Sequence, residues 1–513
     1  MFEPTETEIK LASTPAMLEK LRLHPALVGE EKTDTLVTTY YDTADASLKR
    51  RGASLRIRGG AKDREQTLKL SMPSGSSVRR LEWTTTVVGD LPAPSSFPAK
   101  GRNILARLLK GSSLAPVATS RITRTTRRLQ FGGSTIEIAF DKGTIQVNGR
   151  KAAVCEFELE LVEGQLGDVL ALALQLPLGP DLVWSVTSKA ESCYLLAQDR
   201  KPIAAGAMPT KLKTRMHAAA SLRLICWNCL GQLLANYRLV VASGDPDALH
   251  QSRVAIRRLR AACGLFKDVA DDDEAPLLRA ELKAVAAGLG PSRDLHVMIE
   301  SVVLASKASG QNAGELLDHL RARKAIAMKS AQQLLAGTAF QRLLFQFALW
   351  IESGGWLIQC EEAEVDQPLA RFASRALSKC RRQMRRRGHR VADMSDSARH
   401  RLRIDAKRFR YTVEFFAALY CGKYSIKQRR ALLKALERLQ NCLGELNDMI
   451  VASVARKSMF EGLEPIAAAR LSAQFKDLQD DRGKSRGKLL KDAERSLVLA
   501  TRESVWWKAA RRG

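Results

Sequence analysis

The spacing of hydrophobic residues changes once along the chain. Up to about residue 203, short runs such as Phe157 to Leu161 alternate apolar and charged side chains, which is typical of β-strands. Beyond residue 210, apolar residues recur every three or four positions over long stretches, which predicts helices. Between them, Gln198–Thr210 has two prolines, a glycine and small residues, and it indicates a boundary. We therefore expect a multidomain α+β protein, with a β domain at 3–203, a linker at 204–210, a helical domain at 211–500 and a mobile tail at 501–513.

Each predicted strand carries charged residues on one face and apolar residues on the other. The charged positions are Glu6, Glu8, Lys10, Arg56, Arg58, Lys69, Arg80, Glu82, Asp141, Glu156, Glu158, Glu160 and, in a final strand-like run from Val183 to Leu195, Lys189. An ordinary sandwich would leave these faces in solvent. A barrel instead packs its apolar side against covering helices and lines its lumen with the charged side. Carboxylates could then hold divalent cations, and Lys and Arg could hold phosphate oxygens.

Several motifs occur in order in this half of the chain. They are Glu6, Glu8 and Lys10 as E-x-E-x-K, Tyr40-Tyr41-Asp42-Thr43, the run from Leu48 to Arg58, the E-x-E-L-E-L strand, and a late Ser188-Lys189. In these residues the sequence resembles the CYTH domain of the triphosphate tunnel metalloenzyme superfamily, over about residues 3–203. The resemblance implies an antiparallel β tunnel or barrel with flanking helices. It also implies metal-dependent hydrolysis of inorganic triphosphate to pyrophosphate and phosphate.

The resemblance also implies roles for individual residues. Those implied to bind Mg²⁺ or Mn²⁺ are Glu6, Glu8, Asp141, Glu156, Glu158 and Glu160. Those implied to bind triphosphate are Lys10, Arg56, Arg58, Lys69, Arg80, Arg124 and Lys189, with Lys69 and Glu82 as catalytic residues. Arg124 competes for its inward position with three other arginines of the same run, Arg121, Arg127 and Arg128. Adenylyl cyclase and thiamine triphosphatase activities, which the same superfamily contains, are the alternatives, as is a protein that binds phosphate chains without turnover.

The helical half contains an internal repeat. Ala248–Phe266 recurs as Ala398–Phe416, with matching residues 150 positions apart. In a helix, His250, Arg253, Arg257 and Arg260 fall within a sector of roughly 80°, and so do His400, Arg403, Lys407 and Arg410. Few acidic residues lie one turn away to pair with these cations, so the stripes make physical sense if they meet a polyanion. Pro246 can begin the first helix, and Ser395 or Asp396 can cap the second.

The repeated pattern H-x2-R-x3-[RK]-R-x-R is followed each time by a second echo, residues 289–294 and 443–448. In these residues the sequence resembles the CHAD domain, over about residues 210–500. The resemblance implies an all-α pair of four-helix bundles related by a pseudo-twofold. It further implies that both stripes, His250, Arg253, Arg257, Arg260, His400, Arg403, Lys407 and Arg410, bind inorganic polyphosphate.

The net charge of +27 agrees with this division. Residues 1–203 contain 28 Lys and Arg against 23 Asp and Glu, whereas the remaining chain contains 54 against 32. Nucleic acid would also be attracted, but aromatic residues are only 6% and do not alternate with basic ones as in base-stacking surfaces, so we rank it last. The dense basic run at 379–390 is either a disordered tract or part of a helix in the second bundle.

The remaining composition favours a cytoplasmic protein. Nine scattered cysteines indicate reduced thiols, and Cys226 with Cys229 forms a lone C-x2-C for which core packing is the better interpretation. The first residues lack the basic and apolar segments of a signal peptide, and we expect no membrane span. No pattern indicates an oligomeric state.

Overall fold

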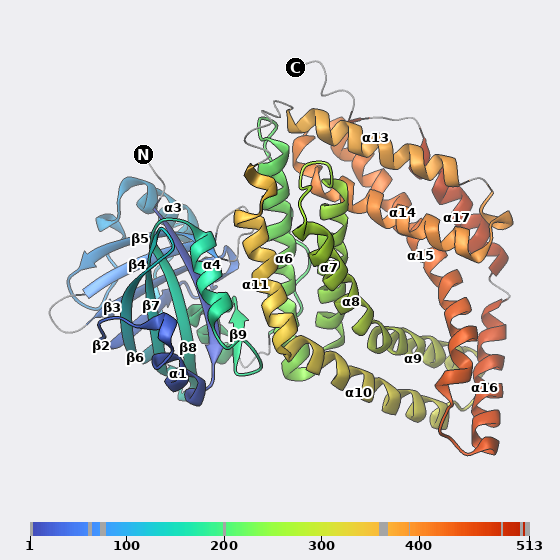
Figure 1. Ribbon diagram of the computed structural model, residues 1–513, viewed down its shortest axis with the longest axis horizontal. Helices are drawn as coiled ribbons and strands as arrows, with labels where there is room; N and C mark the ends of the chain where they lie inside the picture. Colours follow the sequence, from blue (N-terminus) through green and yellow to red (C-terminus); the bar gives the residue numbers. More distant parts are fainter. Residues whose placement is uncertain are drawn as a thin grey trace. The chain divides into compact units, whose positions relative to one another are not determined.

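The computed structural model describes residues 4–59, 64–71, 78–198, 202–358, 368–388, 390–483, 486–502 and 506–507 (Figure 1). For positions 451–458 and 479–483 it describes the backbone only. The chain forms two compact units. The first unit contains Met1–Met208, Cys226–Ala255 and Gln333–Gly355, and the second contains Pro209–Ile225, Ile256–Gln332 and Trp356–Gly513. Three of the described helices, α6 (Ala218–Ser243), α7 (Pro246–Leu265) and α10 (Gly314–Ala336), therefore each contribute to both units.

Nine strands form one antiparallel sheet in the first unit. They are β1 (Thr5–Ser13), β2 (Lys32–Asp42), β3 (Ala53–Gly59), β4 (Arg64–Ser71), β5 (Arg79–Val87), β6 (Ala115–Phe131), β7 (Ser134–Val147), β8 (Arg150–Glu163) and β9 (Leu182–Ser185). Their order is β5-β4-β3-β2-β6-β7-β8-β1-β9, and an additional pairing of β1 with β5 closes eight of them into a barrel. The predicted antiparallel barrel is confirmed.

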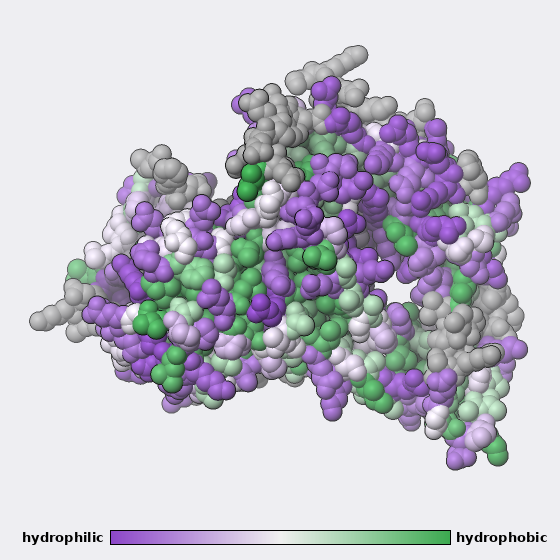
Figure 2. All heavy atoms as spheres, in the orientation of Figure 1, coloured by the Kyte–Doolittle hydropathy of each residue, from purple (hydrophilic) through white to green (hydrophobic). Residues whose placement is uncertain are grey.

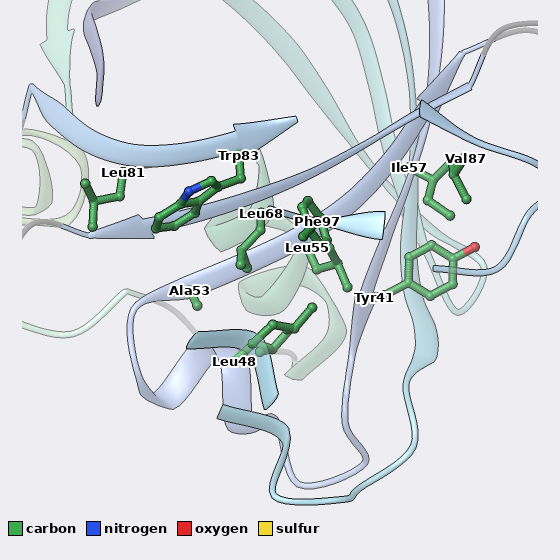
Figure 3. Close-up of a cluster of buried hydrophobic side chains, with 11 residues drawn as sticks. Tyr41, Leu48, Ala53, Leu55, Ile57, Leu68, Leu81, Trp83, Val87 and Phe97 are labelled. Atoms are coloured by element: carbon green, nitrogen blue, oxygen red, sulfur yellow. The ribbon is translucent and has the colours of Figure 1, made fainter. Parts of the chain in front are cut away.

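The alternation of side chains explains the closure. Ile9, Leu11, Phe157 and Leu159 face away from the lumen and are fully buried. The helices beside the barrel include α1 (Pro15–Arg22), α2 (Ser47–Arg50), α3 (Ala99–Leu109) and α4 (Leu166–Gln175). Figure 3 shows the apolar cluster that joins the outer faces of β3, β4 and β5 to α2 and the segment before α3.

A helix that follows β9 packs into one end of the lumen. The run that alternation predicts as a final strand divides into β9 and the helix α5 (Lys189–Gln198), so Lys189 begins a helix and the strand assignment is wrong there. Ser188 explains the change, because its hydroxyl accepts the Glu191 N–H at 3.1 Å and caps the first turn. Ala190 and Cys193 of α5 pack against lumen-side residues of the barrel, which are Tyr40, Ile122, Ile145 and Val154.

The rest of the chain is helical. Besides α6 and α7, the helices are α8 (Glu274–Gly288), α9 (Gly290–Ser309), α10 (Gly314–Ala336), α11 (Thr338–Ser353), α13 (Leu369–Arg387), α14 (Asp396–Phe415), α15 (Lys423–Met459), α16 (Pro465–Gly483) and α17 (Arg486–Thr501). The helices α13, α14, α15 and α17 pack together as a four-helix bundle in the second unit. Asp245 caps α7 and Ser395 caps α14, each through its side chain on the Ala248 or Ala398 amide.

The structure shows where most of the basic run at 379–390 and the two C-terminal tryptophans lie. The basic run up to Arg387 lies in α13, and His389 is outside the described residues. Trp506 and Trp507 are buried: the Trp507 indole donates to Ser378, and its ring meets Phe409 edge-on. The expectation of a mobile tail is therefore wrong for these two tryptophans, and the masked positions of 503–513 lie outside the description.

The helix α6 is long and apolar enough to cross a membrane by those two criteria, and α10 with α11 would pass only as one bent pair. However, 67% of the apolar window of α6 is buried within the protein, as in a core helix. Cys226 and Cys229 are among its fully buried residues, in agreement with their predicted packing role.

Candidate active site and anion-binding surface

The strand register brings the charged residues of the barrel to a single face. Directly opposed residues of antiparallel strands lie on the same side of a sheet. The opposed pairs are Glu6 with Arg80, Glu8 with Glu160, Lys10 with Glu158, Lys69 with Glu82, Arg124 with Asp141 and Asp141 with Glu156. Arg56 and Arg58 join this face through β2 and β4. Because the opposite face packs outward against helices, the lumen receives all of these side chains. Of the four competing arginines, Arg124 and Arg128 lie on this face. Arg124 is largely buried and contacts Asp141 and Glu158, whereas Arg128 is exposed and pairs with Glu137.

One group of lumen carboxylates surrounds an ammonium group. Ligand oxygens of Asp141, Glu156 and Glu158 lie within 4.8 Å of one another, close enough to share a cation. The Lys189 ammonium lies 2.7 Å from Asp141, 2.6 Å from Glu156 and 2.7 Å from Glu158. Lys10 adds a contact of 2.9 Å to Glu158. The ammonium groups of Lys189 and Lys10 therefore lie where a metal ion shared by these three carboxylates would lie.

The surrounding cations keep Asp141 and Glu158 ionised. Burial by itself raises the pKa of Glu158, but Lys10, Lys189 and Arg124 outweigh it and hold the pKa well below its usual range. Burial and Glu158 likewise raise the pKa of Asp141, and Lys189 and Arg124 bring it below the ordinary value. These carboxylates are therefore fully charged and already neutralised by the protein.

A second group of carboxylates is poorly neutralised. Burial, together with the neighbouring charges of Glu6 and Glu8, raises the pKa of Glu160 to about 7. Glu6 Oε2 and Glu8 Oε1 are buried without a hydrogen-bond partner. Lys69 is 2.5 Å from Glu6 and 3.2 Å from Glu82, and Lys10 is 3.5 Å from Glu8, so these two cations only partly offset the carboxylate charges. This group has an excess of negative charge that a further cation would relieve.

The opposite imbalance occurs at Arg56 and Arg58. Burial lowers the pKa of Arg58 to about 10, and the like charges of Arg56 and Arg124 contribute. Arg56 Nε is buried without a hydrogen-bond partner, and Arg58 Nε donates to the Thr38 hydroxyl at 3.3 Å. Within the described ranges, neither guanidinium has a carboxylate at ion-pair distance. These two side chains are placed to receive an anion.

The motif Tyr40 to Thr43, known so far only through a resemblance, has a structural role. Asp42 is fully buried and accepts the amides of Thr43, Leu48 and Lys49, which fixes the short helix α2. The Tyr194 hydroxyl of α5 also donates to Asp42, at 2.6 Å. Asp42 therefore ties α5, and with it Lys189, to the barrel wall.

In the helical region, the two predicted cation stripes lie on α7 and α14. Seven of the eight residues of these stripes are partly exposed, and the eighth, His400, is exposed. On the opposite faces of the same helices, the apolar residues Ala255, Leu259, Ala406 and Phe409 are fully buried. Figure 2 shows a largely hydrophilic surface over α13 and α14. The helices thus bury one face and present cations on the other, as their spacing predicts.

The two repeats meet within the second unit. Burial lowers the pKa of Arg403, Asp448 and Asp294 oppose that effect, and Arg257 adds to it as a neighbouring like charge. Arg257 also approaches the Tyr411 hydroxyl at 3.5 Å, and His400 is 3.0 Å from Asn447. The predicted residues Arg257 and Arg403 are therefore close neighbours.

Sequence reasoning missed several residues at these sites. Asp294, Asn447 and Asp448 lie in the two six-residue echoes, so the repetition marked them without assigning a role. Tyr411 and Tyr194 had no such signal, because each depends on a contact between helices or strands distant in the chain.

Family models match the chain in two places. The model of the CYTH domain matches residues 4–194, and that of the CHAD domain matches residues 224–457. The chain therefore contains a CYTH domain followed by a CHAD domain, as the motifs predicted. It is similar to an inorganic triphosphatase of Haemophilus influenzae, with 30% identity over 194 residues, which are 37% of this chain and 54% of that protein. The chain thus matches only about half the length of this curated relative.

Among solved structures, the crystal structure of the CHAD domain from the plant Ricinus communis is similar to the helical region. The TM-score is 0.50 with 27% identity, and the match covers 58% of this chain and 97% of that chain.

Proposed function

We propose that the barrel hydrolyses inorganic triphosphate to pyrophosphate and phosphate with a divalent cation, and that the helical region binds inorganic polyphosphate. The observation that carries the first part is the charge imbalance of the lumen. Carboxylates around Glu160 that are only partly neutralised share one barrel with two guanidinium groups, Arg56 and Arg58, that have no carboxylate at ion-pair distance in the described residues. A metal–triphosphate complex would relieve both. The triphosphatase activity of the Haemophilus influenzae relative supports the same assignment.

The lumen residues fit a divalent cation such as Mg²⁺ or Mn²⁺. The carboxylates Glu6, Glu8 and Glu160 offer the oxygen ligands that these ions prefer, and they include buried oxygens without partners. We place the ion here in preference to Asp141, Glu156 and Glu158, because Lys189 already neutralises that group. When bound, the cation neutralises phosphate oxygens and stabilises charge that develops during transfer.

The chain's own cations bind and orient the substrate. Arg56 and Arg58 present fork-shaped donors that suit phosphate oxygens, and a bound anion would offset the like-charge repulsion that Arg58 experiences from Arg56. We assign the remaining triphosphate contacts to Lys10, Lys69, Arg80, Arg124 and Lys189. Lys10, Arg124 and Lys189 hold lumen carboxylates in this state, so they would have to exchange part of these contacts for phosphate oxygens.

The lumen also contains a candidate for orienting water. Burial raises the pKa of Glu82, but Lys69 and Arg56 outweigh this and lower it, so the carboxylate is charged near neutral pH. A carboxylate of low pKa is a weak base. Glu82 therefore positions a water molecule by accepting a hydrogen bond, and Lys69, at 3.2 Å, holds Glu82 in place.

The second part of the proposal rests on α7 and α14. Arg257 and Arg403 are brought together against their mutual repulsion, and the stripes to which they belong contain His250, Arg253, Arg260, His400, Lys407 and Arg410. A linear polyanion would offset this repulsion along the whole stripe. A chain of phosphates fits better than nucleic acid, because the aromatic rings beside the α14 stripe, Phe409 and Tyr411, are buried and offer no face on which a base could stack.

A panel of substrates tests the activity and its alternatives. We would incubate the full-length protein with Mg²⁺ and, separately, tripolyphosphate, ATP or thiamine triphosphate, and identify the products by ³¹P NMR. The proposal predicts pyrophosphate and phosphate from tripolyphosphate at the highest rate. Formation of cyclic AMP from ATP would instead indicate an adenylyl cyclase. Faster cleavage of thiamine triphosphate than of tripolyphosphate would indicate a thiamine triphosphatase. No product from any of the three substrates would indicate a protein that binds phosphate chains without turnover.

A further inference from the structure

Strand β1 carries the lumen residues Glu6, Glu8 and Lys10, and one of its two edges is paired with two different strands. β8 lies along the other edge. On the shared edge, β5 pairs with β1 from Thr5 to Thr7, and β9 pairs with it from Lys10 to Ser13. The exchange of partners therefore falls beside Glu8. We call this shared edge of β1, with β5 and β9, the β1 seam.

Helices α6 and α11, in the same compact unit, hold the β9 side of the seam. The Trp184 ring stacks on Phe345 with centroids 4.3 Å apart and meets Trp227 edge-on at 6.5 Å. The Trp184 carbonyl accepts the Tyr237 hydroxyl, and its N–H donates to Gln341 at 3.4 Å. Because Trp184 is only 1% exposed, both the side chain and the main chain of β9 are fixed by these helices.

A guanidinium from α6 also reaches the lumen-side face of β9. Arg238 donates to the Ser185 hydroxyl, and Ser185 is directly opposite Lys10. Opposed residues share a face, so Arg238 holds the strand face to which the lumen lysine belongs. The chain then leads from Ser185 into α5, which begins at Lys189. Fixing Ser185 therefore restricts where both ammonium groups lie.

The β5 side of the seam is held by Glu352 of α11. Its carboxylate accepts from Arg79 at 3.1 Å and from the Trp227 indole at 2.5 Å, and its side chain is 5% exposed. Arg79 lies opposite Thr7 of β1, next to the lumen residue Arg80. Thus α11 anchors β5 at the point where β5 closes the barrel.

We infer that α6 and α11 are a positioning element for the tunnel, with Arg238 and Glu352 as its positioning residues. They hold the two strands of the β1 seam and so set the positions of Glu6, Glu8 and Lys10 relative to one another. The inference rests on the proposed function of the barrel. It assigns the helical region a part in triphosphate binding that needs no polyphosphate.

A contact elsewhere on α11 provides a matched control. Arg342 donates to the Leu174 carbonyl of α4 at 2.9 Å, and α4 is not part of the seam. If α6 and α11 only dock against the barrel, removing Arg238 or Arg342 should have similar consequences. If they position the seam, only the former should change triphosphate binding.

The test compares Arg238→Met, Arg238→Lys, Ser185→Ala and Arg342→Met in the full-length protein. For each we would measure KM and kcat with tripolyphosphate and Mg²⁺, tripolyphosphate affinity by calorimetry, and the melting temperature. Arg238→Met and Ser185→Ala should raise KM and Kd about five- to tenfold with kcat changed less than about twofold, as expected for one lost hydrogen bond to a charged group. Arg238→Lys should restore part of the affinity, and Arg342→Met should leave KM unchanged even if it lowers the melting temperature.

Hydrogen exchange separates this inference from the proposed function. In Arg238→Met and in Glu352→Gln, the amides of Glu6–Leu11 should exchange faster, while those of β2 and β6 should not. A wild-type protein that neither binds nor cleaves tripolyphosphate would refute the proposed function, and the exchange data would still decide the role of α6 and α11. Equal changes in KM for Arg238→Met and Arg342→Met, or unchanged exchange along β1, would overturn the inference.

Discussion

At the scale of single residues, the lumen is defined by charges that their neighbours leave uncompensated. Glu160 and Arg58 both have pKa values displaced toward their neutral forms, to about 7 and about 10. Lys189 shows the reverse, because three carboxylates enclose it and its pKa lies well above the ordinary range in spite of burial. The alternating pattern could place these residues on one face. It could not show which were neutralised, because that depends on where α5 delivers Lys189.

Glu160 gives the metal-free protein a specific dependence on pH. Below its ordinary pKa of 4.5 the carboxyl is protonated in both the folded and the unfolded chain. Between 4.5 and about 7 the folded chain keeps the proton and the unfolded chain loses it, so the stability that this group contributes is lost as the pH rises. In EDTA, Glu160→Gln should therefore raise the melting temperature by a few degrees at about pH 8 and much less at about pH 5.

The exposed Glu163 on the same strand supplies the control. Glu163→Gln should leave the melting temperature nearly unchanged at both pH values. Added Mg²⁺ should narrow the gap between wild type and Glu160→Gln at the higher pH, because the ion offsets the same repulsion. A Glu160→Gln gain that is equal at both pH values would contradict a displaced pKa.

At the scale of elements, the regular strands and the repeat helices were predictable, and the short connecting elements were not. Alternation marks β1, β3 and β8, and the spacing of cations marks α7 and α14. The segment from Val183 to Leu195 reads as one strand, yet Ser188 caps a helix there and the packing of α5 into the barrel decides the outcome. Tertiary contacts of this kind override local patterns.

The stripes of α7 and α14 lead to a prediction about polyphosphate. The double change Arg257→Met/Arg403→Met should weaken polyphosphate binding by about tenfold or more. It should also reduce the salt dependence of binding, because a protein with fewer cations displaces fewer counterions from the polyphosphate. It should change the melting temperature little, because the lost repulsion between Arg257 and Arg403 is offset by the lost attraction of Arg403 to Asp448 and Asp294. Fluorescence anisotropy with labelled polyphosphate over a range of salt concentrations measures the affinity and its salt dependence, and a thermal melt of the same proteins measures their stability.

Arg401 is the matched control for that measurement. It lies on α14 and is exposed, but it is outside the stripe. Arg401→Met should change affinity only slightly. Equal losses for Arg401→Met and for the stripe variant would mean that binding depends on net charge alone.

At the scale of the whole molecule, the motifs identified the two domains, and the compact units revealed how the chain is shared. The sequence alone suggests a division near residue 204, but parts of α6, α7 and α10 and all of α11 belong to the same compact unit as the barrel. The apolar and aromatic residues that join them, such as Trp184 and Phe345, resemble ordinary core positions in a sequence. Only their contacts show that they join a strand of the barrel to a helix of the following region.

The most direct test of the central claim is phosphate release from tripolyphosphate by the wild type and by Glu6→Gln/Glu8→Gln, with Mg²⁺ and with EDTA. Glutamine keeps the size of each side chain and removes two of the charges that raise the pKa of Glu160, so the variant should still fold. We expect release by the wild type only with Mg²⁺, and a loss of at least about a hundredfold in the variant, the scale of removing one charge-stabilising group. Release that persists in EDTA, or an equally active variant, would contradict the assignment of the lumen as a metal-dependent triphosphatase.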